Sequence, residues 1–180
     1  MKFEDIYDAH FAHVWRSLRR LGVREADVAD AAQEVFLVVH RKLGEFEGRS
    51  KMSTWLFGIC LRVARDRSRL AYVRREVAGD DELQAQVDEQ NDLVSGAERR
   101  EGMKILEQIL EQIDFEQRVV FTLFELEALS GDEIAELLQI PTPTVHSRLR
   151  LAREAFRRAV SRLHARGRFA AASLGAGGPA

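Results

Sequence analysis

The chain has 180 residues, of which 46% are hydrophobic and 31% are charged, and its formal net charge at pH 7 is −2. This is the balance of an ordinary globular protein, and it excludes collagen-like and wholly disordered chains. No apolar run reaches the roughly 18 residues of a membrane-spanning helix, so we expect no membrane insertion. The single cysteine, Cys60, cannot form an internal disulfide, and the acidic first residues do not resemble a signal peptide. Both features predict a cytoplasmic protein.

The charges are unevenly distributed along the chain. Residues 1–75 carry a net charge of +5, residues 76–140 carry −14, and residues 141–180 carry +7. Basic ends on both sides of an acidic middle indicate a polyanionic partner such as nucleic acid. Solvated charged faces without any partner would give the same pattern, so the motifs have to decide between the two interpretations.

The N-terminal part of the chain shows only helical periodicity. Hydrophobic residues at spacings of three and four predict helices over about residues 3–21 and 25–43. Gly44 and Gly48 mark a loop, after which Ser53 or Thr54 can cap a third helix. We therefore predict a helical domain over residues 1–75.

The rest of the chain divides into three segments. Residues 76–99 are acidic, rich in amide side chains and short of large apolar ones, which predicts a flexible linker. Hydrophobic periodicity returns over residues 100–166 and predicts a second helical domain, with helices capped by Asp114 and Ser130. We expect residues 167–180 to form a disordered tail. The predicted fold class is all-α, with two small helical domains joined by a flexible acidic linker.

The second domain contains the order of elements of a helix-turn-helix. A short helix follows Ser130, and a turn at residues 139–141 leads into a longer helix capped by Thr142. Gln139 occupies a turn position that often needs a left-handed backbone, at a strain of about 1 kcal/mol. Side chains near the start of the longer helix can reach base edges or phosphates: Thr142, Thr144, His146, Ser147, Arg148 and Arg150. The alternative is a plain helical hairpin with a solvated basic face.

Two helices of the first domain also carry candidate binding faces. The second helix bears an acidic stripe with one exposed leucine, which suits docking to a basic protein surface: Asp30, Gln33, Glu34 and Leu37. The third helix bears an aromatic residue followed by arginines, which can stack unpaired bases and hold a phosphate backbone: Trp55, Arg62, Arg65 and Arg69. Simpler interpretations remain open at this point, namely a solvated stripe on the second helix and a core tryptophan on the third.

Segments of both domains resemble a known family. Asp30-Ala-Ala-Gln-Glu-Val-Phe36, followed by Thr54-Trp-Leu-Phe-Gly-Ile59, looks like region two of bacterial sigma factors. Gln117-Arg118-Val119-Val120, followed by residues 129–138 and 144–153, looks like region four. Their order and spacing over residues 3–75 and 100–163 make the chain similar to the extracytoplasmic-function (ECF) class of the bacterial sigma-70 family of RNA polymerase sigma factors.

The resemblance implies a sigma factor that binds core RNA polymerase and directs promoter-specific transcription initiation. Asp30, Gln33, Glu34 and Leu37 would then face the clamp helices of the polymerase β′ subunit, and the C-terminal domain would also contact the β flap. Opening of the minus-ten element and capture of a flipped base would involve Phe46, Arg49, Ser50, Lys51, Trp55, Arg62, Arg65 and Arg69. The helix-turn-helix residues 142–150 would read the minus-thirty-five element. An anti-sigma factor is a further partner that the resemblance leaves open.

Some positions depart from the family pattern. Arg62 replaces the usual asparagine of the third helix, and Gln139 and Pro143 replace two usual glycines. The customary proline before the Gln117-Arg118 pair is also missing, since Asp114 and Phe115 stand there instead.

Three other classes of protein were weighed against the sigma factor. An enzyme is disfavoured because the sequence lacks a His-Glu-x-x-His motif, a phosphate-binding glycine loop and paired cysteines, and we expect no cofactor or metal. A stand-alone helix-turn-helix repressor would leave the stripe of the second helix and the Trp55 helix without a role. A sigma mimic that only sequesters an anti-sigma factor would not need an arginine-rich recognition helix.

Overall fold

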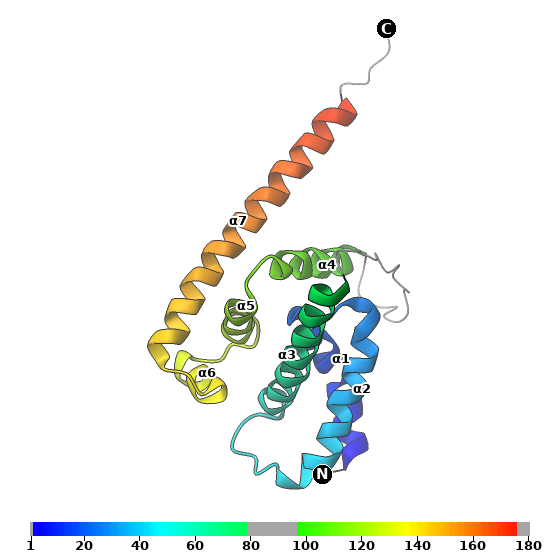
Figure 1. Ribbon diagram of the computed structural model, residues 1–180, viewed down its shortest axis with the longest axis vertical. Coiled ribbons are helices and arrows are strands. Elements are labelled where there is room, and N and C mark those ends of the chain that lie inside the picture. The colour runs from blue at the N-terminus through cyan, green and yellow to red at the C-terminus, as the bar shows by residue number, and fades with distance from the viewer. Residues whose placement is uncertain (1, 79–96, 176–180) are drawn as a thin grey trace. The chain divides into compact units, whose positions relative to one another are not determined.

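The computed structural model describes residues 2–78 and 97–175, with side chains over residues 2–69 and 101–165. Every regular element in these ranges is helical, which confirms the predicted fold class. The chain divides into two compact units, Met1–Met103 and Lys104–Ala180. Figure 1 shows the helices of both units in chain order.

The first unit is built from three helices, α1 (Phe3–Arg20), α2 (Glu25–Lys42) and α3 (Met52–Ala78), each of which packs against the other two. A short 3-10 turn, η1 (Leu43–Glu45), follows α2. Burial of each large core side chain contributes about 1.5–3 kcal/mol. The core includes side chains that are at most 1% exposed, among them Val14, Leu18, Val28, Val35, Val39, Leu56, Phe57 and Cys60. A hydrogen bond of 3.2 Å from His13 Nε2 to the backbone oxygen of Ser53 ties α1 to the start of α3.

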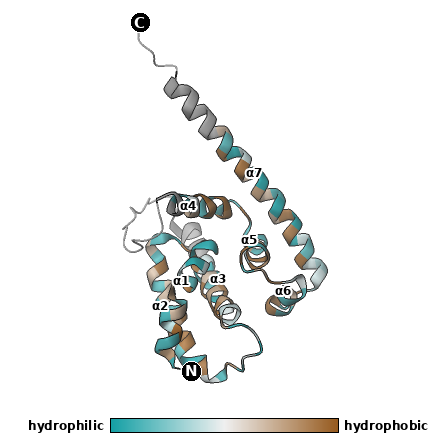
Figure 2. Cartoon of the chain, turned by 180° about the vertical axis from the view of Figure 1, so that it is seen from behind, coloured by the Kyte–Doolittle hydropathy of each residue, from teal (hydrophilic) through white to brown (hydrophobic). Residues whose placement is uncertain are grey.

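The second unit contains the end of α4 (Ala97–Glu111), then α5 (Phe115–Phe121), a π-helical turn η2 (Thr122–Leu126), α6 (Gly131–Leu138) and the long α7 (Thr142–Gly175). Both α5 and α6 pack against α7. Figure 2 shows hydrophobic and hydrophilic segments alternating along α7, as expected of a helix with one apolar side. That side is buried through Val145, Leu149, Ala152 and Ala159.

Two of the three predicted caps of the second unit, Asp114 and Ser130, are present. Asp114 accepts hydrogen bonds from the backbone N–H groups of Glu116 and Gln117 at the start of α5. Ser130 and Glu133 form a complete capping box at the start of α6, with 2.8 Å between the Ser130 nitrogen and a Glu133 carboxylate oxygen. These caps fix where both helices begin.

Arg118 connects α5 to the end of α4. Its guanidinium donates hydrogen bonds to the backbone oxygens of Ile113, at 3.0 Å, and Glu111, at 3.4 Å, which are carbonyls that the end of α4 leaves without helical partners. Burial lowers the pKa of Arg118 below its usual value, and the carboxylates of Glu111 and Asp114 oppose that shift. Arg118 therefore has a structural role within the unit.

The helix ends differ from the predicted segment boundaries. α3 continues to Ala78 and α4 begins at Ala97, so both ends of the predicted linker are helical, and residues 79–96 lie outside the described residues. α7 continues to Gly175, although we expected a disordered tail from residue 167. A single glycine, Gly167, costs a helix only about 1 kcal/mol, and the alanines that follow have the highest helix propensity. Residues 176–180 lie outside the described residues.

Gln139 has the left-handed conformation expected from its position in the turn, with φ 53° and ψ 46°. Its backbone N–H bonds to the carbonyl of Glu136 at 3.3 Å, and the next residue, Ile140, bonds to Ala135 at 3.1 Å. Ala128, with φ 55°, has a second positive φ that the sequence did not indicate.

Replacing Gln139 by glycine should stabilise the protein. The substitution removes the left-handed strain, while glycine costs more backbone entropy, so we expect the free energy of unfolding to rise by up to about 1 kcal/mol. Urea denaturation of the full chain measures it. The control is Glu136→Gly at an exposed helical position of α6, where a loss of about 1 kcal/mol is expected. A loss at Gln139 as well would contradict the prediction.

Candidate polymerase and nucleic-acid interfaces

The exposed side of α2 carries the four residues of the predicted docking stripe: Asp30, Gln33, Glu34 and Leu37. Leu37 keeps 53% of its surface exposed, which is unusual for a leucine on a helix that belongs to the core. Glu34 forms an ion pair with Arg67 of α3 at 3.2 Å, so its carboxylate is held by the fold. The stripe therefore combines acidic residues with one exposed apolar side chain at its C-terminal end.

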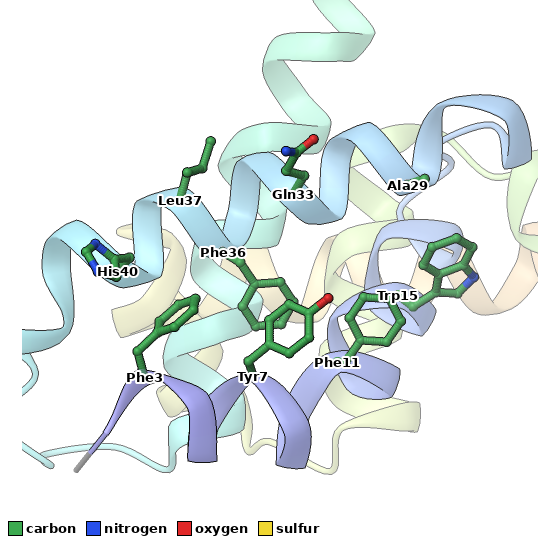
Figure 3. A pocket seen from close by; sticks show the side chains of 9 residues that line it. All are labelled: Phe3, Tyr7, Phe11, Trp15, Ala29, Gln33, Phe36, Leu37 and His40. Carbon is green, nitrogen blue, oxygen red and sulfur yellow. The ribbon is translucent and has the colours of Figure 1, made fainter.

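Two residues of the stripe, Gln33 and Leu37, also border a groove between α1 and α2. The groove has a volume of about 620 Å³, and its other lining residues are almost all apolar or aromatic: Phe3, Tyr7, Phe11, Trp15, Ala29, Phe36 and His40. Figure 3 shows the aromatic side chains of α1 in a row, with Phe36 of α2 against them. The ring centroids of Tyr7 and Phe36 are 4.6 Å apart. An open apolar groove of this kind suits a partner protein.

The aromatic row of α1 lies only partly in the core of the first unit. Tyr7 is 39% exposed, and Phe3, Phe11 and Trp15 are half-buried. A spacing of four residues advances a helix by about 40° beyond a full turn, so a row at every fourth residue drifts away from the core. The strict four-residue spacing of four aromatic residues is the signal in the sequence that could have identified this side of the groove.

The face of α3 that carries the basic residues is continuous. Trp55, Arg62, Arg65 and Arg69 fall within about 80° of one another around the helix. The three arginines are exposed, and Trp55 is half-buried. The structure thus brings these four predicted residues together on one side of the helix, with the aromatic residue at its N-terminal end.

The loop before α3 is anchored by an aromatic contact. The rings of Phe46 and Trp55 are 5.2 Å apart, so the first residue of the predicted DNA-contacting loop packs against the helix. Arg49 pairs with Glu47 at 2.6 Å, and Arg49, Ser50 and Lys51 are all exposed. Gly48 has φ 72°, a conformation that favours glycine in this turn.

In the second unit, α6, the turn and α7 form the predicted helix-turn-helix, with Ile134 and Val145 fully buried between the helices. Thr142 was expected to cap α7 and to contact DNA. Its hydroxyl donates a hydrogen bond of 3.0 Å to Asp132 of α6, so Thr142 does not cap α7, whereas its contact with DNA stays a prediction. The carbonyl of Pro141 accepts the first helical bonds, from Thr144 and Val145, because Thr142 is already part of the helix.

His146 lies directly against the start of α6. A Cβ atom built on Gly131 would be 2.9 Å from its Nε2 atom, so only glycine leaves room for the imidazole in this position. Of the other predicted DNA contacts, Ser147 is exposed and Thr144 is half-buried.

Three arginines of α7 are paired with glutamates. The pairs are Arg148 with Glu116 of α5 at 2.9 Å, Arg150 with Glu154 at 2.8 Å, and Arg153 with Glu125 of η2 at 2.7 Å. The guanidinium of Arg153 also lies over the ring of Phe124, 5.2 Å from its centroid. These pairs are partly exposed, so a phosphate group could compete with each glutamate for its arginine.

The comparisons with protein families match the two units separately. Residues 6–75 match Sigma-70 region 2, and residues 103–156 match Sigma-70, region 4. The chain belongs to the sigma-70 family. Its helix-turn-helix is therefore that of region 4, and its three-helix core is that of region 2.

This sigma factor is similar to two relatives, one of which is named an ECF sigma factor. It is 32% identical to the ECF RNA polymerase sigma-E factor of Escherichia coli over 153 residues, which is 81% of this chain and 80% of the relative. It is 33% identical to the RNA polymerase sigma-H factor of Pseudomonas aeruginosa over 145 residues, which is 76% and 75% of the two chains.

Two solved structures share the fold. The sigma factor RpoE of Bartonella quintana, crystallised with the anti-sigma factor NepR, has a TM-score of 0.65 at 19% identity, with 88% of this chain and 96% of that one covered. CnrH in complex with the cytosolic domain of CnrY has a TM-score of 0.61 at 23% identity, with 88% and 87% covered.

Family and relatives establish the activity. The protein is an ECF sigma factor that binds core RNA polymerase and directs promoter-specific transcription initiation at promoter DNA. Within residues 2–78 and 97–175, no helix is both long and apolar enough to cross a membrane. Among the side chains of residues 2–69 and 101–165, no group of three or more His, Cys, Asp or Glu could hold a metal ion.

The pair between Arg148 and Glu116 should stabilise the second unit. We expect a double-mutant cycle with Arg148→Ala and Glu116→Ala to give a coupling energy of about 0.5–1 kcal/mol, because both side chains are partly buried. The control cycle uses Arg150 and Glu154, a more exposed pair within one helix, for which about 0.3–0.5 kcal/mol is expected. Urea denaturation gives all four free energies in each cycle. A coupling energy of zero between Arg148 and Glu116 would contradict the prediction, and DNA binding would then be the one role left for Arg148.

Proposed function

We propose that the two units of this sigma factor divide the recognition of the promoter. The N-terminal unit recognises and opens the minus-ten element, and the helix-turn-helix of the second unit reads the minus-thirty-five element. The observation that carries this proposal is the face of α3, where Trp55 stands in line with Arg62, Arg65 and Arg69. Stacking on an aromatic ring and neutralisation of phosphates are what a separated DNA strand requires.

The loop before α3 extends this basic face. Arg49, Ser50 and Lys51 are exposed there. Because Phe46 packs on Trp55, the loop is held beside α3, the helix proposed to bind the separated DNA strand. In the second unit, Thr144, His146, Ser147, Arg148 and Arg150 supply the candidate contacts to the minus-thirty-five element. Arg148 and Arg150 would exchange their glutamate partners for DNA in that complex.

Docking to polymerase is assigned to α2. Asp30, Gln33 and Leu37 offer an acidic and apolar surface for the clamp helices of the β′ subunit, with Glu34 beside them. The second unit would contact the β flap. Polymerase carries out the chemistry of RNA synthesis, and the sigma factor adds no catalytic group, cofactor or metal of its own. Its place of action is then the cytoplasm, on the nucleoid.

An anti-sigma factor is a natural regulator of this arrangement. Both structural relatives were solved as complexes, one of them with an anti-sigma factor. The groove between α1 and α2 shares Gln33 and Leu37 with the docking stripe, so a protein seated in it would compete with polymerase.

The decisive experiment is a run-off transcription assay. Core RNA polymerase and this protein would be incubated with a fragmented library of the source genome, and the transcripts sequenced. We expect discrete start sites that share two upstream elements and that disappear without the protein. Sequence-specific DNA binding by the protein alone, without new transcripts, would favour a stand-alone repressor instead.

The basic face of α3 is tested by Arg62→Ala with Arg69→Ala. We expect polymerase binding to be retained, while stable open complexes fall about tenfold and the salt dependence of promoter binding becomes shallower by about 0.7 per lost phosphate contact. The matched control is Arg41→Ala with Lys42→Ala, which removes two exposed charges at the end of α2. Equal losses in both double variants would indicate a general charge effect rather than a strand-binding face.

The docking stripe is tested by Asp30→Lys with Leu37→Lys. Glu34 is left in place because its bond to Arg67 belongs to the fold. We expect the affinity for core polymerase to fall at least tenfold because two repulsive or desolvated charges enter the interface. Fluorescence anisotropy measures the affinity, and far-ultraviolet circular dichroism checks the helices. Asp5→Lys, on α1 outside the groove lining, is the charge control, and unchanged binding of the stripe variant would refute the assignment.

A further inference from the structure

One exposed apolar side chain on the recognition helix has no role in the assignments above. Among the side chains that the structure describes, four large hydrophobic ones are exposed: Tyr7, Leu37, Ile105 and Leu151. Tyr7 and Leu37 line the groove of the first unit. Leu151 lies on α7, in the helix-turn-helix, and is 36% exposed.

The direction of Leu151 follows from its neighbours on α7. The inward side of the helix is defined by Val145, Leu149 and Ala152, which are at most 4% exposed. Leu151 lies on the outward side, one turn after the exposed Ser147 and next to the exposed Arg150. It is about 13 Å along the helix axis from Thr142, and helical side chains lean toward the N-terminus of their helix. Leu151 therefore leans toward the turns that a helix-turn-helix inserts into the major groove.

The surroundings of Leu151 favour DNA rather than an apolar protein partner. The outward side of α7 also carries Arg150, Arg157 and Arg158, all exposed. An apolar partner surface would have to desolvate these charges, whereas DNA phosphates match them. Glu154 also lies on this side, one turn after Leu151, and pairs with Arg150 at 2.8 Å. Cations still outnumber carboxylates around Leu151, which fits a polyanion with a local apolar group at its edge.

We propose that Leu151 is a specificity-determining residue that contacts the 5-methyl group of a thymine in the minus-thirty-five element. The thymine methyl is the one apolar group on the base edges of the major groove. Leucine has no hydrogen-bonding group in its side chain, so it can distinguish bases there only through this methyl or through steric exclusion. The inference rests on the proposed assignment of α7 to the minus-thirty-five element.

The test removes the methyl group and keeps the base pair. After run-off mapping has identified the element, promoter duplexes are made in which each of its thymines, on either strand, is replaced singly by deoxyuridine. Promoter affinity of the complete holoenzyme is then measured with the natural chain and with Leu151→Ala. At one position, we expect the natural chain to lose about three- to fourfold in affinity, the effect of one buried methyl group, and Leu151→Ala to bind both duplexes equally.

Ile105→Ala is the matched control. Ile105 is also an exposed aliphatic residue, 40% exposed, but lies on α4, and its variant should keep the full discrimination between thymine and uracil. Thermal unfolding checks that Leu151→Ala is folded, as expected for an exposed helical position.

The outcomes separate this inference from the proposed function. Absence of specific transcripts in the run-off assay would overturn both. Three outcomes would overturn the role of Leu151 alone, provided that specific transcription is observed. The first is no effect of the methyl group at any thymine, and the second is a minus-thirty-five element free of A·T pairs. The third is discrimination between thymine and uracil that survives Leu151→Ala.

Discussion

The burial of one side of α2 determines what the first unit can present to polymerase. Val28, Val35 and Val39 are completely buried between α1 and α3, which fixes the rotation of the helix about its axis. A shift of one residue would turn the helix by about 100° and carry the charge of Asp30 toward the core, at a cost of several kcal/mol. The docking stripe is therefore a consequence of core packing. The same packing brings Glu34 within 3.2 Å of Arg67, so the stripe is linked to α3, the helix whose basic face is proposed to bind DNA.

In the second unit, ion pairs rather than packing determine how strongly the recognition helix α7 attracts DNA. Arg148, Arg150 and Arg153 are each neutralised by a glutamate of the same unit. Partly exposed pairs of this kind are worth about 0–1 kcal/mol, so a DNA phosphate can replace the glutamate at little cost, yet each pair subtracts from attraction to DNA of any sequence. Weak non-specific binding suits a factor that reaches promoters together with polymerase.

The sequence was sufficient for the fold class, the helix-turn-helix, the caps at Asp114 and Ser130 and the left-handed Gln139, because these depend on local spacing and turn chemistry. It was not sufficient where the answer depends on distant residues. Nothing near Arg148 in the sequence indicates that Glu116, 32 residues earlier, holds its guanidinium. The groove beside α2 likewise arises only when the aromatic row of α1 meets Phe36. The expected tail is rich in both glycine and alanine, and its alanines favour the helix that continues to Gly175.

The two recognition surfaces gain strength from being on one chain. Each proposed surface is modest in size, with a few arginines beside Trp55 in the first unit or beside Leu151 in the second, and each alone would compete poorly for a promoter among other DNA. Once polymerase holds the sigma factor, binding at one element raises the effective concentration of the other surface at its own element. The discrimination at the two elements then multiplies, so a contact worth only threefold, such as one methyl group, still changes which promoters are used.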